Sequence, residues 1–268
     1  LYKSLVGAVV LLLSVTLILI FYNQKSLKKM SVDTQLISRS VLFGNPDKIS
    51  VQISPDGLYI SYVAPLDGVL NVFVAPKDNI SATKAVTNDK KRGIYQYHWH
   101  YDGSLVYYQD DNGDENHVIY RVDIKNNKTD ALTPHGVKSS IRRLSYKYPN
   151  EILIANNQRE KQWFDVFKLD LSSLKQELVF QNDKYLSLTY DDEFKLRLGK
   201  IINPDSSVDI YVFNNDQQDL YKHILPTDVE LFGVVGFDKT GQSIYYVDPS
   251  QSNTAALYID DLAGNRTM

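Results

Sequence analysis

One acidic loop in this sequence has residues that could bind a cation or the amino group of a peptide. It runs from Asp110 to Asn116 and holds four carboxylates, one glycine and two asparagines. Carboxylate oxygens accept charge-assisted hydrogen bonds from ammonium groups, so Glu115 or Asn116 could meet a peptide amino terminus at a domain interface or channel. The alternative is an ordinary solvated hairpin loop. The spacing does not fit an EF-hand, because position 121 is Arg rather than Glu.

A second group of candidates precedes this loop. Arg92 could pair with the acidic loop, bind a substrate carboxylate or serve the local structure. His98 and His100 flank Trp99, so in a strand both imidazoles would point to one face. A metal site would need a third ligand, and the spacing places none. The chain has no cysteine, which excludes thiolate sites and a Cys nucleophile. We therefore expect no metal and no cofactor.

Composition narrows the class of protein. A length of 268 residues allows one large domain or two small ones. Nineteen Tyr and ten Phe against two Met favour strands over helices. The net charge of -3 argues against a nucleic-acid partner, because phosphate binding requires a clustered basic excess.

The acidic loop is flanked by two runs rich in β-branched and aromatic residues. The runs Leu105–Gln109 and His117–Ile124 predict an antiparallel hairpin with the loop at its tip. Third strands are expected at Tyr120–Asp123 and Phe167–Asp170, and short fourth strands at Lys84–Thr87 and Asp130–Thr133.

A turn signal recurs along the chain at intervals near 45 residues. It is found at Ser54–Gly57, Tyr101–Gly103, Tyr148–Asn150, Tyr190–Asp192 and Phe237–Gly241. This period, with about four strands in each repeat, is typical of a β-propeller. The sequence therefore predicts an all-β fold whose four-stranded blades start near 47, 93, 138, 184 and 229. The fifth blade reaches Met268 where its last strand should form, so we expect a partial propeller of about five blades.

The first residues predict a different kind of segment. Residues 5–22 form an uncharged apolar run, which is barely long enough to cross a bilayer. No cleavage pattern follows it, which favours an uncleaved signal anchor over a removed signal peptide. The lysines at 25, 28 and 29 favour a cytoplasmic body, whereas an upstream basic segment would reverse that orientation. We expect a membrane-anchored protein with a periplasmic or other extracytoplasmic body, and leave the orientation open.

Three regions follow from these patterns. Residues 1–29 are the expected transmembrane or signal-anchor segment, and 30–46 are a linker. Within the linker, 31–43 has helical spacing and is ended by Gly44-Asn45-Pro46. Residues 47–268 are the expected partial propeller.

Several stretches together resemble one known family. They are Leu-Phe-Gly-Asn-Pro at 42–46, Ile-Ser-Pro-Asp-Gly at 53–57, Val-Leu-Asn-Val-Phe-Val-Ala-Pro at 69–76, Arg-Gly-Ile at 92–94 before Trp99, and Gly-Asp-Glu-Asn at 113–116 leading into Tyr-Arg-Val-Asp at 120–123. In this order they resemble the N-terminal propeller of prolyl oligopeptidase-family (S9) serine peptidases, in the acylaminoacyl-peptidase and dipeptidyl-aminopeptidase-like branch. The resemblance covers roughly 42–124, and beyond 140 it is mostly the blade period.

The resemblance implies a two-domain enzyme. Its propeller would cover a C-terminal α/β-hydrolase domain and restrict the access of short peptides to a Ser-Asp-His triad. No Gly-x-Ser-x-Gly nucleophile motif occurs in the 268 residues, so no catalytic residue can be assigned. The expected partners are a hydrolase domain, in the same or a split polypeptide, a peptide substrate, and a membrane through residues 5–22. The chain alone is not expected to hydrolyse peptides.

Two other functions fit the same patterns. A membrane-tethered propeller could act only as a protein-binding module. Such a module should complete and cap its last blade, so the turn at 262–268 favours the peptidase hypothesis. A glycosidase-like propeller would need two carboxylates across its channel, and the sequence does not single out a pair.

Overall fold

The computed structural model of the chain describes residues 16–19, 36–44, 46–214, 217–251, 254–262 and 266–267. The chain divides into two units, residues 1–46 and 47–268. In the first unit, residues 16–19 are helical, and α2 spans Arg39–Phe43. The Ser38 side chain caps α2 by accepting a hydrogen bond from the Val41 amide. Because residues 36–38 are not helical, α2 is shorter than the helical stretch expected at 31–43.

The expected membrane anchor at residues 5–22 falls almost entirely outside the described residues, which include only 16–19 of it. Among the residues that the structure describes, no helix is long and apolar enough to cross a membrane. The anchor therefore stays a prediction.

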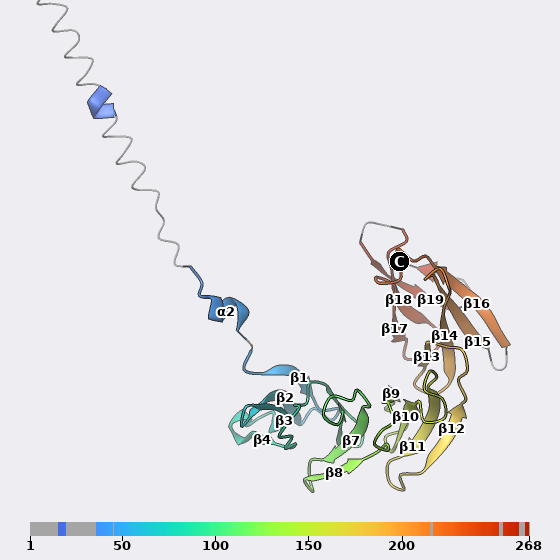
Figure 1. Cartoon of the computed structure of the whole chain (residues 1–268), viewed down its shortest axis with the longest axis horizontal. Helices are drawn as coiled ribbons and strands as arrows, with labels where there is room; N and C mark the ends of the chain where they lie inside the picture. Colours follow the sequence, from blue (N-terminus) through green and yellow to red (C-terminus); the bar gives the residue numbers. More distant parts are fainter. Residues whose placement is uncertain are drawn as a thin grey trace, which may run out of the picture. The chain divides into compact units, whose positions relative to one another are not determined.

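The described residues of the second unit form five four-stranded antiparallel sheets, in each of which the strands lie in chain order (Figure 1). The first three sheets contain β1 Ile49–Ile53, β2 Tyr59–Leu66, β3 Val69–Pro76 and β4 Lys84–Ala85, then β5 Tyr97–Trp99, β6 Leu105–Gln109, β7 Val118–Asp123 and β8 Lys128–Ala131, then β9 Ser139–Leu144, β10 Glu151–Asn156, β11 Asp165–Asp170 and β12 Gln176–Phe180. The last two contain β13 Ser187–Tyr190, β14 Leu196–Ile202, β15 Val208–Asn214 and β16 Gln217–Ile224, then β17 Gly233–Phe237, β18 Ile244–Asp248, β19 Ala256–Asp260 and β20 Arg266–Thr267. A 3-10 turn, η1 Ile80–Ala82, precedes β4.

These sheets confirm the predicted all-β fold of four-stranded units. The first strands begin at residues 49, 97, 139, 187 and 233, close to the predicted starts. The predicted hairpin strand Leu105–Gln109 matches β6, and its partner β7 is one residue shorter at each end than His117–Ile124. The prediction for the second sheet's fourth strand was wrong by two residues, because β8 starts at Lys128, where it pairs with Asp123.

A tight turn joins the first and second strands of the sheets. In the first sheet the Gly57 amide donates to the Ser54 carbonyl at 2.8 Å, and the Leu58 amide donates to the Asp56 carboxylate at 3.0 Å. In the second sheet the Gly103 amide donates to the His100 carbonyl in the same way. The φ of Gly103, +84°, lies in the left-handed region that favours glycine. The aspartates of the predicted turn signal therefore serve as local acceptors for backbone amides.

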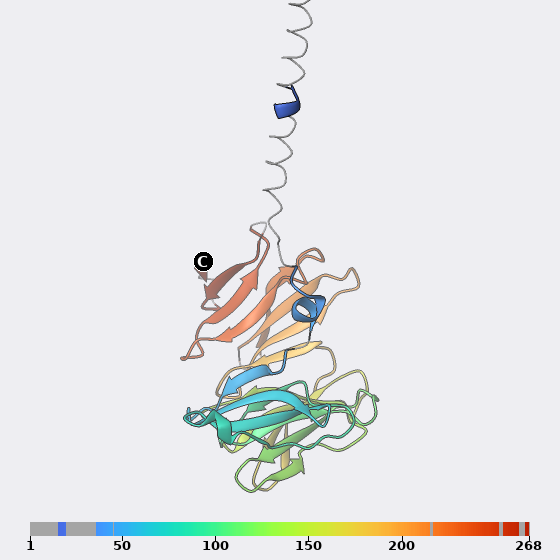
Figure 2. The ribbon, with the colours of Figure 1, turned by 90° about the vertical axis from the view of Figure 1, so that its left-hand side faces the viewer.

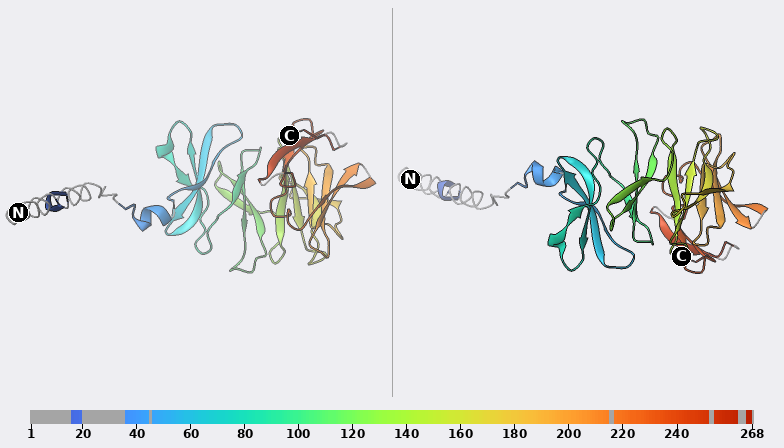
Figure 3. Two further views of the ribbon diagram at one scale, coloured as in Figure 1. Left: turned by 90° about the horizontal axis from the view of Figure 1, so that it is seen from above. Right: turned by 90° about the horizontal axis from the view of Figure 1, so that it is seen from below.

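Four apolar clusters hold the sheets together, one between each successive pair. In chain order they include Val72 and Leu105, Val106 and Ile154, Leu153 and Tyr190, and Ile210 and Tyr246. Neighbouring residues of a strand, such as Leu153 and Ile154, belong to different clusters because successive side chains point to opposite faces of a sheet. Sheets packed face to face through both surfaces are the arrangement of propeller blades. Figure 2 shows the antiparallel strands of the first sheet in cyan, and Figure 3 shows the twist of the sheets.

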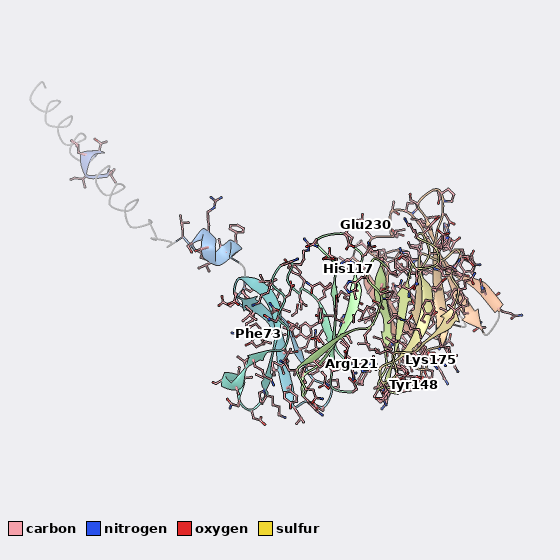
Figure 4. All side chains as sticks on the ribbon, turned by 60° about the horizontal axis from the view of Figure 1, so that its bottom comes forward. Phe73, His117, Arg121, Tyr148, Lys175 and Glu230 are labelled. Atoms are coloured by element: carbon pink, nitrogen blue, oxygen red, sulfur yellow. The ribbon has the colours of Figure 1, made fainter. Side chains whose placement is uncertain are left out.

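The antiparallel order gives each sheet two rims. The turns after the first strands, at 54–58, 100–104, 145–150, 191–195 and 238–243, lie at what we call the Asp-turn rim. The loops between second and third strands, at 67–68, 110–117, 157–164 and 203–207, and the connections between sheets lie at the linker rim. Figure 4 shows His117 and Glu230 at the linker rim and Tyr148 and Lys175 at the opposite one.

Candidate functional site

The predicted loop 110–116 lies at the linker rim, and Arg92 contacts it. The Arg92 guanidinium donates to both oxygens of Asp110, at 3.2 and 3.4 Å. Its own amide donates to Asp89 at 2.9 Å. Burial alone would raise the pKa of Asp110, but the hydrogen bonds from Arg92 and from the Glu115 amide hold it below its ordinary value. Of the three roles considered for Arg92, the structure shows pairing with the acidic loop.

Glu115 and Asn116 have different environments in this loop. The Glu115 side chain is 80% exposed and lies 3.9 Å from the Lys138 ammonium. Its φ of +58° is unusual for a residue with a side chain. Asn116 instead donates its side-chain amide to Asp114 at 3.0 Å, and this bond is the main reason that the pKa of Asp114 is lowered. Glu115 therefore carries an exposed carboxylate, while Asn116 stabilises the loop.

A cavity of about 250 Å³ adjoins Arg92 and Asp110. Its other walls include Asp89, Tyr120 and His135. A larger cavity of about 1200 Å³ lies at the Asp-turn rim, over the fourth and fifth sheets, and is lined largely by charged and amide side chains. Its Asp191 and Arg197 are already paired with each other at 2.9 Å.

The two histidines of the second sheet do not form a metal site. His98 is exposed, whereas His100 is fully buried, and its Nε2 lies 3.1 Å from the Glu151 carbonyl of the next sheet. Within the part of the chain that the structure describes, no group of three or more His, Asp or Glu side chains could hold a metal ion.

The Asp-turn rim carries a set of ion pairs that we did not predict from the sequence. Asp102 pairs with Arg121 and with His100, and Arg121 also donates to the Leu171 carbonyl of the third sheet at 3.4 Å. Burial alone would raise the pKa of Asp102, but hydrogen bonds from His100 and Ser104 hold it well below its ordinary value. Arg121 thus links the Asp102 turn to the third sheet, while Asp102 also accepts from the Ser104 amide of its own turn.

Arg142, on β9, is a second residue that sequence reasoning missed. Its Nε is buried without a hydrogen-bond partner among the described residues, and its guanidinium carbon lies 5.9 Å from the centroid of the Phe164 ring. The signal in the sequence is Ile141-Arg142-Arg143-Leu144, because two adjacent arginines stand between the apolar residues of a first strand.

Sequence comparison finds two curated relatives. Dipeptidyl aminopeptidase BIII from Pseudoxanthomonas mexicana is 39% identical over 240 residues, which covers 88% of this chain and 35% of that protein. Dipeptidyl peptidase family member 6 from Caenorhabditis elegans is 26% identical over 244 residues, covering 84% of this chain and 33% of that protein. The chain thus spans about a third of the length of these relatives. A search against protein families found no match.

Solved structures show the same fold at low sequence identity. The β-propeller domain of the Trilobed protease from Pyrococcus furiosus has a TM-score of 0.54 at 17% identity, with 82% of this chain and 70% of that one covered. Oligopeptidase B from Trypanosoma brucei has a TM-score of 0.56 at 13% identity, with 81% and 33% covered. The repeated sheets and these neighbours define the chain as a β-propeller.

Within that class the sequence relatives are specific. The homologues are dipeptidyl aminopeptidases of the prolyl oligopeptidase (S9) family, and the chain corresponds to about a third of their length, which confirms the resemblance seen in the sequence.

Proposed function

We propose that this chain is the substrate-gating propeller part of a prolyl oligopeptidase-like serine peptidase. The observation that carries the proposal is the 39% identity to a dipeptidyl aminopeptidase, which extends over 88% of the chain. The complete protein would hydrolyse short peptides by acyl transfer through a Ser-Asp-His triad outside these 268 residues. The propeller itself would contribute access control and substrate recognition.

The linker rim supports a role in recognition. Glu115 offers an exposed carboxylate, and the Lys138 ammonium lies 3.9 Å from it. An ammonium group of a peptide would form a closer charge-assisted hydrogen bond there. Arg92 would hold the loop in place through Asp110 rather than touch the substrate.

Reporter hydrolysis tests this function. The purified 268-residue chain should not release 4-nitroaniline from alanyl-alanyl-4-nitroanilide, whereas the same chain expressed with the coding sequence that follows codon 268 should do so. A gating propeller also predicts that the longer product cleaves this reporter and spares a long unfolded protein such as casein. Activity of the purified 268-residue chain, or rapid cleavage of casein, would contradict the proposal.

We also propose that residues 5–22 anchor the protein in a membrane, with the propeller outside the cytoplasm. The support for the anchor is the uncharged apolar run of 18 residues. A propeller outside the cytoplasm further requires more positive charge before this run than the three lysines that follow it supply. The native protein should remain in the membrane pellet after washing with alkaline carbonate. A protease added to intact spheroplasts should then degrade the propeller, and protection from that protease would contradict the proposed side.

A further inference from the structure

The first strand of the third sheet contains a β-bulge, and its extra residue is Arg142. On β9 and β10, Arg143 pairs with Leu153 and Ile141 pairs with Ile154, which leaves Arg142 without an opposite residue. A bulge re-aims the side chain of its extra residue. The bulge therefore gives Arg142 a direction that the regular alternation of the strand would not.

The same repeat position is bulged in the first and fifth sheets. Val51 lies three residues before Ser54, which opens the turn of the first sheet, and Val235 lies three residues before Asp238, which opens that of the fifth. Each valine lies within a register shift of its strand. These valines are 63% and 65% exposed. Arg142 has the equivalent place, three residues before Ser145. A charged residue thus replaces an exposed valine at a repeated position, so propeller architecture alone does not require it.

The charge of Arg142 is not compensated within the described chain. Its Nε is buried without an acceptor among the described residues, and its guanidinium lies over the uncharged Phe164 ring. Its neighbour Arg143 instead donates to the Asp192 carboxylate at 2.6 and 3.1 Å. Burial lowers the pKa of Arg142, as expected for a cation removed from water. An unpaired buried charge lowers stability, which marks the position as one that an anion would complete.

The surroundings favour a carboxylate over a more highly charged anion. Tyr108 from the second sheet and Tyr190 from the fourth lie close enough to Arg142 to interact with its charge. Burial raises the pKa of both phenols, so each keeps its proton at neutral pH. The Tyr190 hydroxyl is buried without a partner, and the Tyr108 hydroxyl accepts from the Ile141 amide at 2.9 Å, which leaves its own proton for another acceptor. One planar guanidinium and two neutral donors match a single, planar negative group.

We propose that Arg142 binds a carboxylate of a peptide, held by the guanidinium and by the hydroxyls of Tyr108 and Tyr190. The inference rests on the proposed function, because it assumes that the peptide is a substrate that reaches the propeller. The carboxylate is either the carboxyl terminus of the peptide or an acidic side chain, and the peptides used in the test distinguish these two sources.

Calorimetric titration of the 268-residue chain tests this proposal with three peptides: trialanine, trialanine amide and Ala-Glu-Ala amide. Trialanine should bind at least about tenfold more tightly than its amide, since a hydrogen bond to a charged group contributes about that factor or more. Tight binding of Ala-Glu-Ala amide as well would identify a side-chain carboxylate as a second source. The Arg142→Met variant should bind all three peptides equally, and Arg142→Lys should keep part of the preference.

Arg143→Met is the matched control, because it removes an equal charge from the next position of β9, where the charge is paired with Asp192. This variant should keep the preference for a carboxylate. The melting temperature of Arg142→Met should equal or exceed that of the parent chain, because an unpaired buried charge is replaced by an apolar side chain of similar length.

Three results would overturn the inference. They are equal binding of the three peptides by the parent chain, a carboxylate preference that survives in Arg142→Met, and no binding of any of the peptides. Equal binding would still agree with a peptide-gating propeller, and the reporter assay judges that function separately.

Discussion

The two rims of the sheets use charge in different ways. At the Asp-turn rim, Asp191 is 3% exposed and its partner Arg197 is 20% exposed, and Arg197 also donates to the Gly241 carbonyl of the next sheet. At the linker rim, Arg92 pairs with Asp110, and their side chains are 52% and 9% exposed. The Asp191–Arg197 pair therefore helps to join two sheets, whereas the Arg92–Asp110 pair leaves its arginine accessible to a partner.

This difference follows from where the turns lie. The Asp turns are short, so their carboxylates stay close to the neighbouring sheet, as Asp192 does when it accepts from Arg143. The loop 110–116 is longer and contains its own hydrogen bonds, such as those from Asn116 to Asp114. Because polar groups of this loop form hydrogen bonds with one another, side chains such as Glu115 are not needed to hold the loop in place. The linker rim therefore offers at Glu115 an exposed carboxylate that the fold does not require.

The largest expected effect is at Asp191. The Asp191→Asn variant leaves Arg197 without its counter-ion in a mostly buried place, which should lower the free energy of unfolding by about 3 kcal/mol. Urea unfolding followed by tryptophan fluorescence measures this loss. The matched control, Asp110→Asn at the linker rim, should move the urea midpoint far less, because Arg92 stays solvated. Equal losses in the two variants would remove the distinction between the rims.

Lowering the pH should destabilise the fold by protonating Asp102 at the Asp-turn rim. The pKa of the folded-state Asp102 carboxyl is held well below its ordinary value of about 4. The ionised carboxylate therefore stabilises the fold above about pH 4, and this stabilisation is lost as the pH falls towards the folded-state pKa. The parent chain should therefore lose stability below about pH 4.

The Asp102→Asn variant checks this prediction, because it should be less stable at pH 7 and should show a shallower dependence on pH in the acid range. The control is Asp67→Asn, which removes an ion pair with Lys90 whose side chains are 75% and 54% exposed. An acid dependence as steep in Asp102→Asn as in the parent would show that other groups carry it.

A smaller effect is expected from the turn backbone. Gly103→Ala places a side chain at φ +84° and should lower the free energy of unfolding by about 1 kcal/mol. Gly233→Ala is the control, since its added methyl group would meet no atom within 4 Å and its φ is not in the left-handed region. Urea midpoints compare the two variants. A cost at Gly233 as large as that at Gly103 would argue against the Asp turn as a conformational constraint.

The smallest effect on folding is expected at Glu115. Glu115→Gln should leave the urea midpoint unchanged, because this exposed carboxylate holds no part of the fold together. The same variant should bind trialanine about tenfold more weakly, since a charge-assisted hydrogen bond to the peptide ammonium would be lost. N-acetyl-trialanine is the control peptide, and its affinity should not change. Unaltered binding of trialanine would exclude Glu115 as the recognition residue.

The sequence predicts the repeat well because its determinants are local. The glycines and aspartates of turns such as 54–57 act through bonds within a few residues, and the apolar runs between them set the strands. Fourth strands are less predictable, because β4 and β8 are short and exposed and are placed by pairing with β3 and β7. Their positions depend on register, which the strand pattern alone does not give.

The site is only partly predictable for a related reason. Arg92 and the acidic loop stand out as charges near a turn, and they do meet. Asp102 meets Arg121 because the pairing of β6 with β7 brings the turn 100–104 beside Arg121. Arg142 is left without an opposite residue because of a bulge. Neither register nor bulge position can be derived from the order of residues along one strand.

The most direct test of the central claim is to sequence the gene beyond codon 268. We predict an in-frame segment that encodes Gly-x-Ser-x-Gly, followed by an Asp and a His in that order, as a prolyl oligopeptidase-like peptidase requires. A stop codon at that point, with no such segment in a neighbouring reading frame, would contradict the assignment to a working peptidase and leave a propeller whose function is binding.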